Sequence, residues 1–96
     1  MASSTIKNTE LNYVDKEVEV TISANGSANI EGAYNYWGLP SSSFKLVSVV
    51  ALGNEYRVLP SAVNDNNNYI RVRFENFSGE AFTSKAVTVR LFYIKY

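Results

Sequence analysis

The sequence predicts an all-β domain: an antiparallel β-sandwich or jelly-roll-like fold of about six to seven strands. Apolar and polar residues alternate over several short segments, and no segment follows a helical period. Turn-forming residues separate these segments at spacings of roughly 8–15 residues. The chain is also rich in Val, Ile, Tyr, Phe, Asn and Ser, which favours strands and turns over helices. Its 96 residues are enough for one domain with one modest core.

The first expected strand is Glu17–Ser23, in which apolar residues fall on one face and polar residues on the other. The dipeptide Asn25-Gly26 follows and tolerates positive φ at both central positions of a turn. Residues 28–33 are therefore expected to return as the second strand. Residues 1–10 are expected to form a flexible leader, and residues 11–96 the single domain.

Residues 34–43 break the alternation and contain Gly38, Pro40 and three serines, so we expect a long irregular connection. Residues 44–52 then form a strand that is apolar on both faces. Such a strand is typical of the centre of a sheet, where both faces are covered. A short strand is expected to follow and to end at Pro60, which cannot donate a hydrogen bond to a neighbouring strand.

The polar segment 61–68, which ends in the run Asn64–Asn68, is expected to be a loop. Residues 69–75 alternate again. Ile70, Val72 and Phe74 are expected to face inward, and Arg71, Arg73 and Glu75 outward. Arg71 and Arg73 could contact a phosphate or a carboxylate. Pairing with Glu17 or Glu19 on a neighbouring strand is the simpler use of these charges. Residues 76–84 are expected to be a loop, and residues 86–96 the last strand.

The last strand does not alternate along its whole length. One face carries Val87, Val89, Leu91 and Tyr93; the other begins polar and then carries Phe92, Ile94 and Tyr96. Because an exposed row of this kind would be adhesive, we predict that Phe92, Ile94 and Tyr96 contribute to an oligomer interface. The alternative is that the connection 34–43 folds over this row within one chain.

Catalytic and metal-binding signatures are weak in this sequence, and we expect neither an enzyme nor a bound metal or cofactor. It contains no histidine and no cysteine. Glu17 and Glu19 share an exposed strand face, whereas paired catalytic carboxylates need a cleft. Asp65 is the one carboxylate in its asparagine-rich run, and a solvated loop explains that run better than a calcium site.

Charge and hydropathy exclude further classes of function. Nine basic and nine acidic residues give no net charge, which argues against a nucleic-acid partner. No apolar run approaches the roughly 20 residues of a membrane span, so no membrane insertion is expected. The first residues lack a basic region followed by an apolar one, so no secretory signal peptide is expected.

The segment Tyr34–Pro40 holds the candidate ligand-binding residues Tyr34, Tyr36 and Trp37. Aromatic rings of this kind stack on sugars and also serve in protein interfaces. A single tryptophan in a small sandwich also commonly packs at one end of the core. The residues alone leave both interpretations open.

The order of these features resembles the C-terminal β-sandwich domains of bacteriophage and prophage tail-fibre, baseplate and receptor-binding proteins. The resemblance covers roughly Val18 to Tyr96 and rests on a pattern of hydrophobicity and turns. The features that carry it are Val18-Glu19-Val20-Thr21-Ile22-Ser23, Ala24-Asn25-Gly26-Ser27, the apolar strand Leu46–Ala51, Arg71-Val72-Arg73 and the closing strand Val87–Ile94. Typical members are glycine-rich where this chain has Tyr34–Leu39, so the ligand surface departs from the family pattern.

This resemblance implies a non-enzymatic virion protein, usually trimeric, that adheres to a host cell-surface glycan or protein receptor. Its location would be the virion tail fibre or the extracellular space. Weak single sites would gain strength by engaging together. Two alternatives remain open: a monomeric carbohydrate-binding module of a secreted enzyme that uses the same aromatic residues, and a structural decoration or assembly domain without a ligand.

Overall fold

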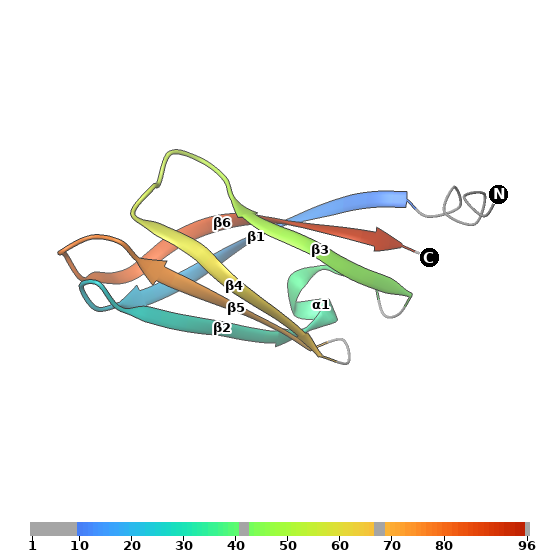
Figure 1. Cartoon of the computed structure of the whole chain (residues 1–96), viewed down its shortest axis with the longest axis horizontal. Helices are drawn as coiled ribbons and strands as arrows, with labels where there is room; N and C mark the ends of the chain where they lie inside the picture. Colours follow the sequence, from blue (N-terminus) through green and yellow to red (C-terminus); the bar gives the residue numbers. More distant parts are fainter. Residues whose placement is uncertain (1–9, 41–42, 67–68, 96) are drawn as a thin grey trace.

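The computed structural model describes residues 10–40, 43–66 and 69–95, which form an antiparallel β-sandwich (Figure 1). This confirms the predicted all-β class. The strands are β1 (Glu10–Ile22), β2 (Ser27–Ala33), β3 (Phe44–Ala51), β4 (Val58–Asn66), β5 (Tyr69–Asn76) and β6 (Phe82–Lys95). A single helical turn, α1 (Tyr34–Trp37), lies between β2 and β3 in the chain.

The strands form two three-stranded sheets. Sheet A has the order β1-β6-β3, and sheet B has the order β2-β5-β4. All hydrogen-bonded neighbours are antiparallel. The first four strands alternate between the two sheets, and β5 and β6 return as the central strands. This nested pairing, β1 with β6 and β2 with β5, is that of a jelly roll reduced to six strands.

The inner faces of the two sheets make one core. The alternation predicted for residues 17–23 and 69–75 is confirmed, because every second residue is buried. Ile70, Val72 and Phe74 of the central strand β5 have no exposed surface. The other buried apolar residues are Val18, Val20, Ile22, Trp37, Leu39, Phe44, Val58, Val87, Val89 and Leu91.

Three strands are longer than the sequence predicts. β1 and β6 pair from Glu10 opposite Lys95 to Ile22 opposite Phe82, so both begin upstream of their expected starts. β4 runs through Pro60, where the sequence predicts an end. Because β4 is an edge strand and its register shifts just after Pro60, a residue without an N–H is tolerated there. Residues 1–9 of the expected leader and residues 67–68 of the expected loop lie outside the described residues.

Two further expectations are wrong. β3 lies at the edge of sheet A rather than at its centre, since it hydrogen-bonds only to β6. Neither Arg71 nor Arg73 pairs with Glu17 or Glu19, because those glutamates lie on sheet A and both arginines on sheet B. Arg71 instead forms an ion pair with Glu31 of β2, with 2.8 Å between Nε and Oε2.

Candidate functional site

The aromatic segment folds into α1 and packs mainly inward. Trp37 is fully buried, and its indole Nε1–H donates a hydrogen bond to the carbonyl of Ile70, 3.2 Å away. The prediction that Trp37 lines a ligand surface is therefore corrected: its ring belongs to the core. Tyr34 is half-buried against that core. Tyr36 is 41% exposed, with the Lys16 ammonium 4.2 Å from its ring centroid.

Two glycines explain why this segment forms a compact turn. Gly38 has a φ of 83°, a left-handed conformation that ends α1 and lets the Leu39 N–H donate to the Tyr34 carbonyl at 2.9 Å. The ring of Tyr36 lies directly against Gly32 of β2, where a Cβ atom would come within 2.5 Å of it. α1 therefore packs tightly against β2, and Trp37 fills the interior between the sheets.

The described part of this connection, residues 34–40 and 43, does not cover the second face of the last strand, so the alternative of an intramolecular cover finds no support there. Residues 41–42 of the connection lie outside the described residues. Phe92 and Ile94 lie on the outer face of sheet A, where they stand opposite Tyr13 and Leu11 of β1. Trp37 lies on the other side of that sheet, in the core. Tyr96, the third predicted interface residue, lies outside the described residues.

The outer face of sheet A carries a cluster that we call the outer apolar patch: Leu11, Tyr13, Val50, Phe92 and Ile94. Leu11 is 66% exposed and Tyr13 56% exposed. The rings of Tyr13 and Phe92 lie with centroids 6.1 Å apart. Arg90 lies over the ring of Tyr13, but Leu11 and Tyr13 remain more than half exposed, so the patch is open to a partner.

One ion pair borders this patch. Arg90 donates to both carboxylate oxygens of Asp15, at 2.8 and 3.0 Å, and its guanidinium lies 4.0 Å from the ring centroid of Tyr13. The hydrogen bond from Arg90 lowers the pKa of Asp15 below its ordinary value. The border therefore carries one fixed positive and one fixed negative charge at neutral pH.

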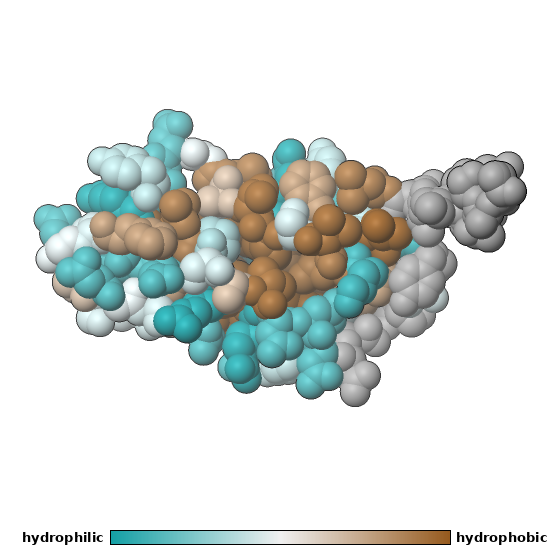
Figure 2. All heavy atoms as spheres, in the orientation of Figure 1, coloured by the Kyte–Doolittle hydropathy of each residue, from teal (hydrophilic) through white to brown (hydrophobic). Residues whose placement is uncertain are grey.

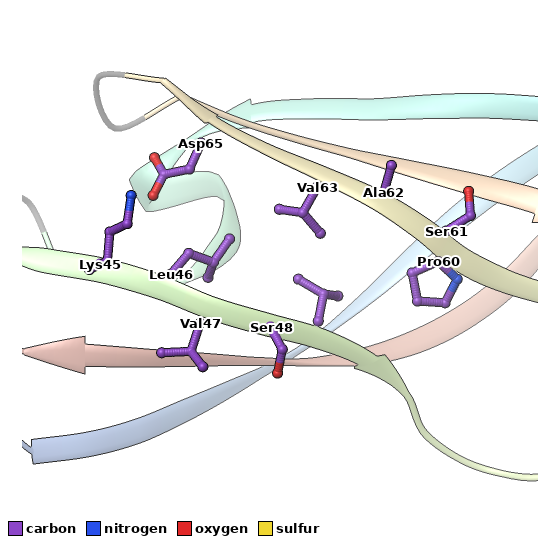
Figure 3. Close-up of a pocket in the computed structure, with 10 residues that line it drawn as sticks. Lys45, Leu46, Val47, Ser48, Pro60, Ser61, Ala62, Val63 and Asp65 are labelled. Carbon is purple, nitrogen blue, oxygen red and sulfur yellow. The ribbon is translucent and has the colours of Figure 1, made fainter.

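A groove of about 470 Å³ opens on the other side of β3, between β3 and β4. Leu46 of β3 and Val63 of β4 point into it, while Lys45 and Asp65 face one another at one end (Figure 3). Figure 2 shows apolar side chains gathered over β3 and over the space between the two strands. The other lining residues are Val47, Ser48, Val49, Pro60, Ser61 and Ala62.

β3 joins the groove to the outer apolar patch, because its residues line both. As an edge strand it also leaves backbone N–H and C=O groups unpaired along one side. Its exposed residues Val47 and Val50 are 52% and 40% exposed. An apolar edge strand of this kind is adhesive unless something covers it.

Sequence reasoning found Phe92 and Ile94 but missed Leu11, Tyr13 and Val50. A signal for the first two was present: the alternation that begins at Glu17 extends back through Asp15 to Tyr13 and Leu11. Val50 had no such signal, because the same apolar pattern fits a central strand as well as an exposed edge.

Within the described ranges, no group of three or more His, Cys, Asp or Glu side chains could hold a metal ion. In the same part of the chain, no helix is long and apolar enough to cross a membrane. No protein-family model, curated protein sequence or solved structure matches this chain. A function is therefore proposed from the surfaces of the chain itself.

Proposed function

We propose that this chain is a non-enzymatic assembly and adhesion domain whose copies associate through the outer apolar patch. The observation that carries this proposal is the exposure of Leu11, Tyr13 and Val50 beside Phe92 and Ile94 on one sheet face. Removing apolar surface from water yields about 25 cal/mol per Å². Burying this patch against a partner is therefore favourable, whereas the single chain leaves the patch exposed to water.

The border of the patch favours a second copy of the chain as the partner. An apolar centre with a charged rim is typical of protein interfaces. The rim holds Asp15 and Arg90, which carry opposite charges. Because these two charges neutralise each other within the chain, the rim carries no net charge that would repel the same rim of a second copy.

The resemblance to tail-fibre domains supports the setting that we propose: a phage virion or another extracellular fibre. In that setting three copies would associate, and each would present its remaining surface to a host-cell glycan or protein. Joining three weak sites raises the overall affinity without any new contact. The copy number and the setting are parts of the proposal that rest on the resemblance.

The carbohydrate-module alternative loses part of its support. It relies on three aromatic side chains at the surface, yet Trp37 is buried and Tyr34 half-buried. Tyr36 remains as an exposed ring. A structural decoration domain without a ligand would use the same outer apolar patch, so it differs from our proposal only in lacking adhesion.

The experiment that tests the assembly is a comparison of molar mass by light scattering. Phe92→Ser combined with Ile94→Ser should lower the mass to that of one chain while the circular dichroism spectrum stays unchanged. The matched control is Glu17→Ser with Glu19→Ser, at exposed positions on the polar half of the same sheet face. This control should keep the wild-type mass. An oligomer that survives the Phe92 and Ile94 substitutions would overturn the proposed interface.

A further inference from the structure

The outer face of sheet B has a different character from that of sheet A. It carries a hollow of about 310 Å³ that is lined mainly by polar side chains. The hollow exists because Ala62 of β4 stands opposite Arg73 of β5, so a small residue lies beside a long one. We call it the Arg73 hollow; its lining residues are Asn29, Ala62, Val63, Asn64, Arg71 and Arg73.

The two arginines of this hollow differ in their partners. Arg71 is held by Glu31 at 2.8 Å. Among the described residues, no carboxylate lies within ion-pair distance of the Arg73 guanidinium, which is exposed on the same face. A free guanidinium offers a planar fork of donors that matches a carboxylate. Arg73 is therefore the position at which this face can accept a negative charge.

Asparagine side chains flank the arginines on both sides. Asn29 of β2 stands opposite Arg73, and Asn64 of β4 stands opposite Arg71. Each amide offers both donors and an acceptor, which is the combination that a sugar hydroxyl requires. The small residue Ala62 leaves room between them. The hollow thus combines one cation that no described carboxylate pairs with and neutral groups suited to hydroxyls.

A second, smaller hollow of about 70 Å³ adjoins the first, with which it shares Asn64 and Arg71. It is lined in addition by Asn66 and by Tyr69, whose ring is 47% exposed. The Tyr69 hydroxyl donates to Glu31 at 3.3 Å, so what this residue offers a ligand is the exposed ring for stacking. A ligand longer than one sugar ring can therefore continue along β5.

We propose that the Arg73 hollow binds a carboxylate-bearing sugar, with the carboxylate on Arg73 and the hydroxyls on Asn29 and Asn64. Glu31 and Glu75 project from the same sheet face, so the face opposes an extended polyanion but admits a single negative group. The hollow lies on the sheet opposite the outer apolar patch, so both surfaces can be occupied together. That sugar binding in this hollow serves adhesion rests on the proposed function.

The test is a titration of the full chain followed by ¹H–¹⁵N spectra. The probes are glucuronic acid and N-acetylneuraminic acid, with glucose and inorganic phosphate as comparisons at matched ionic strength. We expect both acidic sugars to shift the resonances of residues 29, 64 and 73. Glucose has no carboxylate, so it cannot form the charged hydrogen bond to Arg73. It should therefore bind at least about tenfold more weakly than the acidic sugars. Equal binding of glucose, equal binding of phosphate, or no binding of either acid would each overturn the proposal.

Two variants sharpen this test. Arg73→Gln should reduce the affinity for both acidic sugars by about tenfold or more, whereas Lys45→Gln, which removes an exposed cation of β3 outside the hollow, should leave it unchanged. Asn64→Ala should lower the affinity for glucuronic acid more than the affinity for acetate, because acetate has no hydroxyl groups. The assignment would be contradicted if Asn64→Ala lowered the affinity for glucuronic acid and for acetate equally. It would also be contradicted if Arg73→Gln bound the acidic sugars as tightly as the wild type does.

The failure of this inference is distinguishable from the failure of the proposed assembly. Light scattering on the same samples reports the mass independently of sugar binding. An oligomer that binds no acidic sugar overturns the Arg73 hollow alone. A monomer that binds the acids through Arg73 overturns the assembly alone.

Discussion

Tyr13 of β1 and Phe92 of β6 stand opposite one another on the outer face of sheet A, with ring centroids 6.1 Å apart and planes at 57°. Their positions in sequence are far apart, and the long pairing of the first and last strands brings them together. Tyr13 is nevertheless 56% exposed. The pair therefore forms the centre of an apolar surface that another copy can cover.

Replacing Tyr13 with serine should weaken self-association. Aromatic residues near the centre of an interface commonly contribute about 2 kcal/mol or more, which corresponds to roughly thirtyfold in the dissociation constant. Sedimentation equilibrium measures this constant. Tyr56→Ser is the matched control, because Tyr56 is a tyrosine with 76% exposure that lies outside the patch. Equal dissociation constants for the wild type and Tyr13→Ser would show that Tyr13 does not contribute to the interface.

The substitution Gly32→Ala should destabilise the domain by forcing α1 away from β2. A Cβ atom at this position would lie 2.5 to 2.8 Å from three carbons of Tyr36. Overpacking of this kind typically costs about 1–3 kcal/mol. Urea denaturation followed by Trp37 fluorescence measures the free energy of unfolding. Gly79→Ala should be close to neutral, because among the described residues no atom beyond its own chain neighbours lies within 4 Å of a Cβ there.

Asn76 links the two loops that connect the sheets at one end of the sandwich. Its buried amide donates to the carbonyls of Ser23 and Glu80, at 3.2 and 2.6 Å, and its Oδ1 accepts from the Ser78 N–H at 3.0 Å. Asn76→Ala removes all three hydrogen bonds: the Ser23 carbonyl keeps the Gly26 N–H and the Glu80 carbonyl keeps the Ser78 hydroxyl, but the Ser78 N–H loses its acceptor. The substitution should lower the free energy of unfolding by about 1–3 kcal/mol. Chemical denaturation measures the loss.

Asn54→Ala provides the control for that experiment, because Asn54 is an exposed residue of the turn between β3 and β4. It should change the stability little. A stability of Asn76→Ala equal to that of the wild type would show that the loops hold together without this amide.

Glu55 should make the stability of the domain depend on pH in the acidic range. Hydrogen bonds from Arg57, and to a smaller degree from Lys85, lower its pKa from an ordinary 4.5 to about 2. Because the folded-state pKa lies below the unfolded one, ionisation favours the folded state. The contribution is fully present above pH 4.5 and is lost as the pH falls toward 2.

Denaturant titrations of the wild type and of Glu55→Gln at several pH values measure this contribution. The difference in unfolding free energy should shrink steadily as the pH falls through that window. A difference that is constant with pH would mean that Glu55 ionises alike in the folded and unfolded chain.

Local patterns predicted much of the fold. The strict alternation in residues 17–23 and 69–75 identified two strands and their inward faces correctly, because burial of one face leaves a period of two. Most of β4 was missed: the short strand expected before Pro60 contains only its first residues, Val58 and Leu59, because residues 61–66 are polar and rich in asparagine. Pairing with β5 forms that strand despite its low propensity, and such long-range pairing has no local signal.

The candidate site was harder to predict. Two apolar faces in residues 44–52 indicated that both faces are covered, yet β3 lies at the edge of sheet A: Phe44 is buried in the core, whereas Val47 and Val50 are exposed. Sequence alone does not say which neighbour supplies a cover. Trp37 shows the opposite problem: its segment suits a surface motif as well as a core position, and only the folded chain shows the ring buried and bonded to the Ile70 carbonyl.

The most direct test of self-association is the molar mass of the unmodified chain in solution, measured by multi-angle light scattering over a range of micromolar concentrations. We predict a mass three times that of one chain, with dissociation on dilution. A dimeric mass would retain the outer apolar patch as an interface and contradict the copy number. A mass equal to one chain at every concentration would contradict the account.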